Sequence, residues 1–200
     1  PKRLGVPGEE RYIGKGVSYC ATCDGFFFSG KQVVVVGGGN SALDEGLFLT
    51  RFAERVTIIH RRDRLRADAI LQERALHHNK MAFIWDTIVE EIAGSTTVTH
   101  LRLKNVKTGA SSEFPVDGVF VFIGHKPNTE LFAGQVTLDG GGYIETDRRT
   151  RTNLPGVFAC GDVQDSIYRQ AITASASGCM AAIEVEKYIA ELEGKAYPGR

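Results

Sequence analysis

The order of apolar and polar residues predicts a strand, a glycine turn and a helix between residues 31 and 52. Four consecutive valines, Val33 to Val36, are typical of a strand that is buried on both faces of a parallel sheet. Three glycines follow, and Asn40 and Ser41 can cap the helix that begins there. The apolar residues of this helix recur at helical spacing and form one broad face: Ala42, Leu43, Leu47, Leu49 and Phe52.

The residues that follow predict the rest of an α/β unit. Residues 87–116 contain three segments in which apolar and polar residues alternate, and this pattern predicts an antiparallel meander. The parallel strands and the helix expected around the meander are strands at 55–60, 82–85 and 118–124 and a crossover helix at 67–80.

The character of the chain changes after residue 124. We expect short strands around the turn at residues 140–142, a strand at 154–163 that ends in Gly-Asp, and a helix from about 171 to 192. Residues 1–15 are polar and interrupted by Pro and Gly, so we expect a linker there. The segment 125–200 resembles the last piece of a domain, and the chain as a whole resembles part of a longer protein.

The overall composition excludes some functions. Lys and Arg number 24 and are balanced by 24 Asp and Glu, so the protein has no net field that would attract nucleic acid or an anionic membrane. The longest apolar runs are too short to span a bilayer.

The glycine turn has the spacing G-x-G-x-x-A, formed by Gly37, Gly39 and Ala42. The first glycine permits a tight turn, the second lets the backbone approach a pyrophosphate, and the alanine keeps the helix close to the strand. The N-terminus of the helix also attracts phosphate. This pattern predicts a dinucleotide site.

A basic loop follows the second strand, and its charge indicates which dinucleotide, NAD(H) or NADP(H), the predicted site would bind. An NAD site usually has an acidic residue at this strand end, whereas this chain has Arg61, Arg62 and Arg66 nearby. Guanidinium groups match a phosphate bidentately, so the loop predicts NADP(H). The alternative is a solvated basic loop without a ligand.

A Cys-x-x-Cys pair, Cys20 and Cys23, is the second chemical element. This spacing allows a reversible disulfide, and Asp24 is placed to handle protons. The alternatives are half of a zinc site or an inert buried pair. The two further cysteines, Cys160 and Cys179, lie in unrelated contexts, so we expect no metal and two free, buried thiols.

Five stretches together resemble the low-molecular-weight thioredoxin reductases of bacteria. They are CATCDG (20–25), VVVVGGGNSA (33–42), HRRDRLRA (60–67), IGHKPNT (123–129) and FACGDVQDSIYRQAITASASGCMAA (158–182). The resemblance covers nearly the whole chain in the family's order.

This resemblance implies residue roles. Cys23 would face a flavin, Cys20 would attack the disulfide of thioredoxin, and Asp24 would move the proton. The residues implied for NADPH are Gly37, Gly39, Asn40, Ser41, Ala42, His60, Arg61, Arg62, Arg66, Ile123 and Gly124. Those implied for FAD are Gly161, Asp162, Arg169, Gln170 and Ala171.

The family's FAD domain is split around its NADPH domain, which predicts the organisation of this chain. We expect residues 1–15 to be a linker and a remnant of the FAD domain, 16–124 the NADPH domain with its Rossmann-like sheet, and 125–200 the carboxyl-terminal part of the FAD domain. The FAD site would then be incomplete here, and the chain alone inactive. The resemblance also implies a cytoplasmic enzyme that is a homodimer at full length. The alternatives are an NADP(H)-binding module without chemistry and the flavin subunit of a peroxide reductase.

Overall fold

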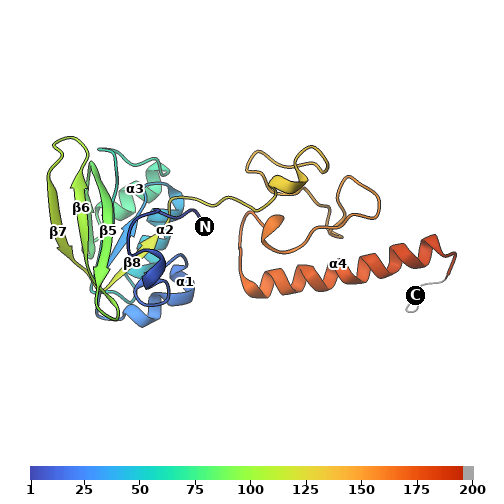
Figure 1. Ribbon diagram of the computed structural model, residues 1–200, viewed down its shortest axis with the longest axis horizontal. Coiled ribbons are helices and arrows are strands. Elements are labelled where there is room, and N and C mark those ends of the chain that lie inside the picture. Colours follow the sequence, from blue (N-terminus) through green and yellow to red (C-terminus); the bar gives the residue numbers. More distant parts are fainter. Residues whose placement is uncertain (196–200) are drawn as a thin grey trace. The chain divides into compact units, whose positions relative to one another are not determined.

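The computed structural model describes residues 1–195, and the chain divides into two compact units. The first unit comprises residues 1–125 and the second begins at Lys126. Figure 1 shows both units, coloured along the sequence. Within the described part, no helix combines the length and the apolar character needed to cross a membrane.

A parallel sheet forms the centre of the first unit. Its strand order is β1-β8-β2-β3-β4, and all neighbouring strands run parallel. The strands are β1 (Val17–Ser18), β2 (Gln32–Val36), β3 (Arg55–Ile59), β4 (Met81–Ile84) and β8 (Gly118–Val121). The predicted α/β fold with a parallel and an antiparallel sheet is therefore confirmed.

The two faces of strand β2 are buried by different layers. Val33 and Val35 pack with the helical layer, which contains α2 (Asn40–Leu49) and α3 (Ala69–Leu76). Val34 and Val36 pack with the meander. Burial of a valine side chain contributes about 1.5–3 kcal/mol, so covering both faces explains why this strand has no polar position after Gln32.

The predicted meander is present as an antiparallel sheet of three strands. They are β5 (Thr87–Gly94), β6 (Val98–Asn105) and β7 (Ser111–Pro115). Ile92, Leu101 and Leu103 are among the buried residues that the meander turns toward the parallel sheet. The alternation in the sequence thus marks a sheet with one buried face and one solvated face.

The amino-terminal segment is more ordered than a linker. It contains the 3-10 helix η1 (Glu10–Tyr12), and the Tyr12 hydroxyl donates to the carbonyl of Gly94 at 2.6 Å. The buried Glu9 carboxylate accepts the main-chain N–H groups of Leu4 and Gly5. Residues 1–15 thus pack with the first unit, while their assignment to an FAD domain stays a prediction.

The second unit consists mostly of turns and one long helix. Its helical elements are η3 (Glu130–Phe132), η4 (Gly161–Val163) and α4 (Ala171–Leu192), and the helix predicted at 171–192 is confirmed. The strand predicted at 154–163 is wrong, because a bend and a turn occupy residues 153–156 and the 3-10 helix η4 occupies its end, and only Phe158 makes a bridge, to Arg151. Leu154 accepts the N–H of Val157, so its carbonyl closes a turn in place of a ladder.

Candidate functional site

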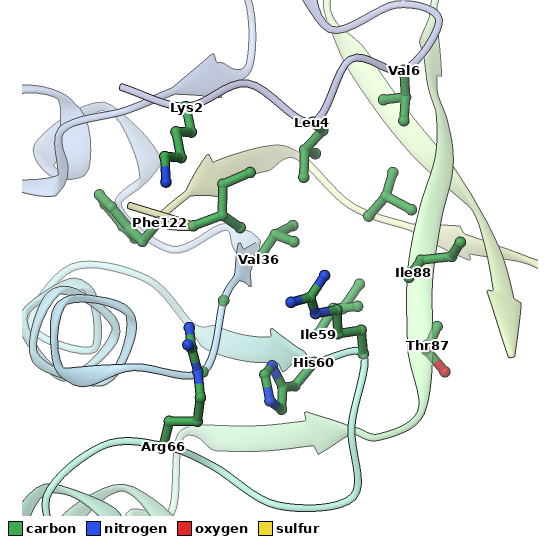
Figure 2. Close-up of a pocket in the computed structure, with 15 residues that line it drawn as sticks. Lys2, Leu4, Val6, Val36, Ile59, His60, Arg66, Thr87, Ile88 and Phe122 are labelled. Carbon is green, nitrogen blue, oxygen red and sulfur yellow. The ribbon is translucent and has the colours of Figure 1, made fainter. Parts of the chain in front are cut away.

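A pocket of about 530 Å³ lies at the carboxyl ends of strands β2, β3 and β8. Its polar side includes Gly37, Gly38, His60, Arg61 and Arg66. Figure 2 shows the side chains of His60 and Arg66 on the opposite side of the pocket from those of Lys2 and Leu4. The apolar wall is formed by Leu4, Val6, Val36, Ile59, Ile88, Val89, Phe122 and Ile123. The carboxyl ends of parallel strands are the usual place for a nucleotide in this kind of sheet.

Two glycines of the turn differ in the space that surrounds them. A Cβ on Gly37 would lie 2.5 Å from the carbonyl oxygen of Phe122 and 2.7 Å from the Cβ of Ala42. Gly39 has no neighbouring atom within 4 Å of a Cβ position. The first glycine therefore serves close packing, and the space in front of the third is open to a ligand.

The start of helix α2 differs in one respect from the sequence analysis. Gly39 is the N-cap residue, and no side chain caps the helix there, whereas we had expected Asn40 and Ser41 to do so. Both of these residues lie in the first turn. The first N–H groups of a helix have no partner within it, so this end is suited to a phosphate.

His60 is buried beneath the glycine turn, with 6% of its surface exposed. Its Nε2 atom has no hydrogen-bond partner among the described residues. Burial lowers the pKa of His60, and the charges of Arg66, Arg61 and Arg62 lower it further, against a backbone hydrogen bond at Arg64. The imidazole is therefore neutral near pH 7, with one ring nitrogen left for a ligand.

The basic loop brings two of its predicted arginines to the pocket. Arg61 and Arg66 line it, whereas Arg62 is exposed and is not among the lining residues. The N–H of Arg66 donates to the carbonyl of Gly38 at 2.7 Å, which joins the loop to the glycine turn. The turn predicted to bind the pyrophosphate and two of the guanidinium groups predicted for the 2′-phosphate thus share one pocket.

The predicted redox pair forms a disulfide bond between Cys20 and Cys23. Cys20 is the N-cap of α1 (Ala21–Asp24), and its sulfur accepts the N–H of Cys23 at 3.1 Å. The Asp24 carboxylate accepts the hydroxyl of Ser18 at 2.6 Å. Both sulfurs and the carboxylate are thus held in one short segment, followed by the 3-10 helix η2 (Gly25–Phe28).

The two remaining cysteines are free, as predicted, but they are not buried. Cys160 is half-buried and Cys179 is exposed. The buried strand expected at Cys160 is absent, and Cys179 lies on helix α4, in which only Ala181 and Glu184 are buried. Among residues 1–195, no group of three or more His, Cys, Asp or Glu side chains is placed to hold a metal ion.

The residues implied for FAD lie in the second unit. The N–H of Gly161 donates to the Ser177 hydroxyl at 3.0 Å, which holds η4 and its exposed Asp162 against helix α4. Gln170 is the N-cap of α4 and forms a capping box with Thr173. The structure describes Arg169 and Ala171 on either side of this cap.

Asp165 shapes the loop that leads into helix α4. Burial works to raise the pKa of Asp165, but hydrogen bonds from the main chain of residues 167–169 and from Thr173 outweigh it and lower the pKa. The carboxylate is therefore ionised and holds the loop before the cap. Asp165 is not among the site residues predicted from the sequence.

Sequence reasoning also missed two contacts that hold the basic loop. Asn40 and Asp68 make a double hydrogen bond, and Lys107 forms ion pairs with Asp63 and Asp86. The partners are 21 to 44 residues apart. The only local signal was Asp68, an acidic residue in the first turn of the helix predicted at 67–80.

Comparison with known proteins places these features in a family. The family model described as pyridine nucleotide-disulphide oxidoreductase matches residues 1–178. A thioredoxin reductase of Streptomyces coelicolor is 53% identical over 200 residues, which cover 98% of this chain and 62% of the relative. A thioredoxin reductase of Rickettsia bellii is 58% identical over 190 residues, which cover 93% of this chain and 61% of the relative.

Solved structures agree with the sequence relatives. The crystal structure of thioredoxin reductase from Streptococcus pyogenes has a TM-score of 0.91 and 46% identity, over 95% of this chain and 62% of the other. Thioredoxin reductase from Giardia duodenalis has a TM-score of 0.86 and 39% identity, over 94% of this chain and 62% of the other. The chain thus spans about three-fifths of the length of these relatives. With a family model matched across most of its length, the chain belongs to the pyridine nucleotide-disulphide oxidoreductase family.

Proposed function

We propose that this chain is the NADPH-binding and disulfide-exchanging part of a thioredoxin-disulfide reductase. The observation that carries the proposal is the Cys20–Cys23 disulfide in the same unit as a pocket lined by Arg61 and Arg66. A redox disulfide and a site suited to a phosphorylated dinucleotide are two of the requirements for this activity. The relatives named thioredoxin reductase support the choice of substrate.

The pocket fits NADPH on three observations. The space before Gly39 is open, the buried Nε2 of His60 has no partner among the described residues, and two guanidinium groups line the rim. The glycine turn and the start of α2 would hold the pyrophosphate: Gly37, Gly39, Asn40, Ser41 and Ala42. The adenosine end with its 2′-phosphate would contact His60, Arg61, Arg62 and Arg66, and Ile123 and Gly124 would line the remaining side.

FAD is the second cofactor in this proposal. When bound, it would relay the reducing equivalents of NADPH to the Cys20–Cys23 disulfide. Asp162 would accept a hydrogen bond from the ribityl chain, and Gly161 lets it approach. Arg169, Gln170 and Ala171 at the start of α4 would face the ring, where the positive end of the helix favours negative charge.

The chain's own residues then carry out disulfide exchange. In the reduced pair, the Cys20 thiolate attacks one sulfur of the thioredoxin disulfide, forms a mixed disulfide and releases the other sulfur as a thiolate. Cys23 then attacks the Cys20 sulfur, which restores the Cys20–Cys23 disulfide and releases the second thioredoxin thiolate. Asp24 and solvent take the protons that the Cys20 and Cys23 thiols lose and return them to the two released thiolates, so that two protons are lost and two are gained. The hydrogen bond from Cys23 N–H favours the thiolate on Cys20, because it stabilises negative charge on that sulfur.

The proposal extends to the whole protein by resemblance. Thioredoxin would be the protein partner, the enzyme would be cytoplasmic, and two copies would form a homodimer at full length.

A single-turnover experiment tests the function. The 200-residue chain is reduced with dithiothreitol, freed of reductant, mixed with oxidised thioredoxin and quenched by alkylation. We expect thioredoxin thiols to appear with the unaltered chain, a mixed disulfide to accumulate with Cys23→Ser, and neither product with Cys20→Ser. Cys179→Ser is the matched control and should behave as the unaltered chain.

The same assay, extended by an NADPH titration and by the disulfide-containing partner of a peroxide-reducing system as a second substrate, separates the alternatives. A chain that binds NADPH but reduces neither disulfide substrate would be a nucleotide-binding module. A chain that reduces the partner disulfide of a peroxide-reducing system and leaves thioredoxin oxidised would be the flavin subunit of such a system. Either result would contradict the proposal.

A further inference from the structure

Two hydrogen bonds join the side chain of Asn40 to Asp68 beside the pocket. Asn40 Nδ2 donates to the Asp68 carboxylate at 2.7 Å, and the Asp68 N–H donates to Asn40 Oδ1 at 2.8 Å. The carboxamide thus uses both its donor and its acceptor toward one residue. The pair links the first residue of helix α2 to the N-cap of helix α3.

Neither side chain does what its position in the local sequence favours. Asp at an N-cap normally accepts an N–H of its own helix, and Asn at a helix start competes for the same role. Here α3 has no side-chain cap at Asp68, and α2 has none at Gly39. Both polar groups are committed to the link between the two helix starts.

The Asn40–Asp68 link helps to fix the main chain around Arg66. The N–H of Arg66 donates to the carbonyl of Gly38 at 2.7 Å, and the Asn40–Asp68 pair lies two residues further along. Between them, Ala67 is buried in the helical layer, as is Leu65 on the other side of Arg66. The main chain around Arg66 is therefore held against the glycine turn, while its guanidinium extends into the pocket (Figure 2).

We propose that Asp68, through Asn40, is a positioning residue that holds Arg66 at the 2′-phosphate and so contributes to the preference for NADPH over NADH. This inference rests on the proposed function, in that it takes the pocket to bind NADPH. Asp68 itself does not touch the nucleotide. It keeps the spacing between the turn that would bind the pyrophosphate and the arginine that would bind the 2′-phosphate.

The hydrogen bond of Asp68 to Asn40 and the negative charge of Asp68 should have opposite effects on NADPH binding, so an experiment can distinguish them. A carboxylate two residues from Arg66 repels a phosphate dianion, so loss of the charge alone should strengthen NADPH binding. Loss of the hydrogen bond should weaken it, because Arg66 then loses its fixed backbone. The two explanations predict opposite signs for the same variant.

Three variants of the full 200-residue chain test the inference, each titrated with NADPH and with NADH. Asp68→Ala removes both the charge and the acceptor, whereas Asp68→Asn removes the charge and keeps an acceptor for Asn40. Asp68→Ser keeps a residue that favours an N-cap but is too short to reach Asn40, so it guards against loss of helix α3. Thermal unfolding of each variant reports the fold independently.

We expect Asp68→Ala and Asp68→Ser to weaken NADPH binding about threefold to tenfold, the range of one lost hydrogen bond, with less than a twofold change for NADH. Asp68→Asn should bind NADPH as tightly as the unaltered chain or more tightly. Unchanged or stronger NADPH binding by Asp68→Ala and Asp68→Ser would overturn the inference, as would an equal loss for both nucleotides. If Asp68→Ala and Asp68→Ser did not show the expected loss of NADPH affinity while the unaltered chain still preferred NADPH to NADH, the inference would be overturned and the proposed function would stand. If the unaltered chain bound neither nucleotide, both would be overturned.

Discussion

The imidazole of His60 packs directly against Gly38, so closely that the glycine has no room for a side chain. A Cβ on Gly38 would lie 2.4 Å from both Cε1 and Nδ1 of the ring. Because the ring is buried, it cannot move away without disturbing the floor of the pocket. The middle glycine of the turn is therefore fixed by a contact with the next strand.

A Gly38→Ala substitution should both destabilise the first unit and weaken NADPH binding. Overpacking of a close-packed site costs typically about 1–3 kcal/mol, and the displaced His60 would enter the pocket. Gly39→Ala is the matched control, since its Cβ meets no atom within 4 Å. It should lower NADPH affinity by filling the phosphate space, and it should lower the thermal midpoint less than Gly38→Ala, because it loses only the preference for glycine at the N-cap of α2. Equal midpoints for the two variants would contradict the contact described here.

The pH dependence of stability should carry a contribution from His60. Its pKa in the folded chain is lowered from 6.5, chiefly by burial, so below pH 6.5 the unfolded chain binds the proton more readily. The stability that His60 contributes is thus complete above pH 6.5 and is lost as the pH falls toward the folded-state pKa. Urea unfolding between pH 7.5 and about 5 measures this loss, and His60→Asn should lose less stability over the same interval. Parallel curves for the two proteins would speak against a neutral, buried imidazole.

The arginines of the basic loop should contribute unequally to the preference for NADPH. Arg61→Ala and Arg66→Ala should each reduce NADPH affinity about tenfold to a hundredfold, the effect of one lost charge-assisted hydrogen bond, with little change for NADH. Arg62 stays a predicted contact, but its position outside the pocket lining leads us to expect a smaller loss for Arg62→Ala. Titration of both nucleotides decides this. If the affinities for NADPH and NADH fell together, the loop would be a general electrostatic aid.

Thiol reactivity should divide the four cysteines into two pairs. The exposed Cys179 and the half-buried Cys160 should react with a thiol reagent in the native, unreduced chain, Cys179 faster. Cys20 and Cys23 should become reactive only after dithiothreitol, because they form the disulfide. Mass spectrometry after alkylation identifies the modified residues. Modification of Cys20 or Cys23 before reduction, or only two modified cysteines after it, would contradict the assignment.

Flavin should bind this 200-residue chain weakly, so that the purified chain is colourless and still binds NADPH. The second unit has a small core, with Val136, Ile144 and Ala159 as its buried cluster among the described residues. Apolar side chains near the start of α4, such as Ile167 and Ile172, are largely exposed. Ordering such a unit around a cofactor opposes binding. A visible absorption spectrum is the measurement, and stoichiometric flavin in the purified chain would contradict the expectation.

The elements of the fold that the sequence predicted well are those with a strong local pattern. The valine run of β2, the alternation in β5–β7 and the long periodicity of α4 each reflect which face a single element buries. The strand predicted at 154–163 failed, because a short apolar run flanked by Pro and Gly suits a turn as well as a strand. Local pattern alone does not decide between the two.

The chemistry that the sequence by itself determined is the set of residue types: a Cys-x-x-Cys pair, a glycine turn and a basic loop. Tertiary structure decided their geometry. It placed Arg61 and Arg66, but not Arg62, on the pocket, and it set His60 against Gly38. It also joined Asn40 to Asp68 across 28 residues. Such pairings depend on how strands and helices pack side by side, so no periodicity or spacing within one element could reveal them.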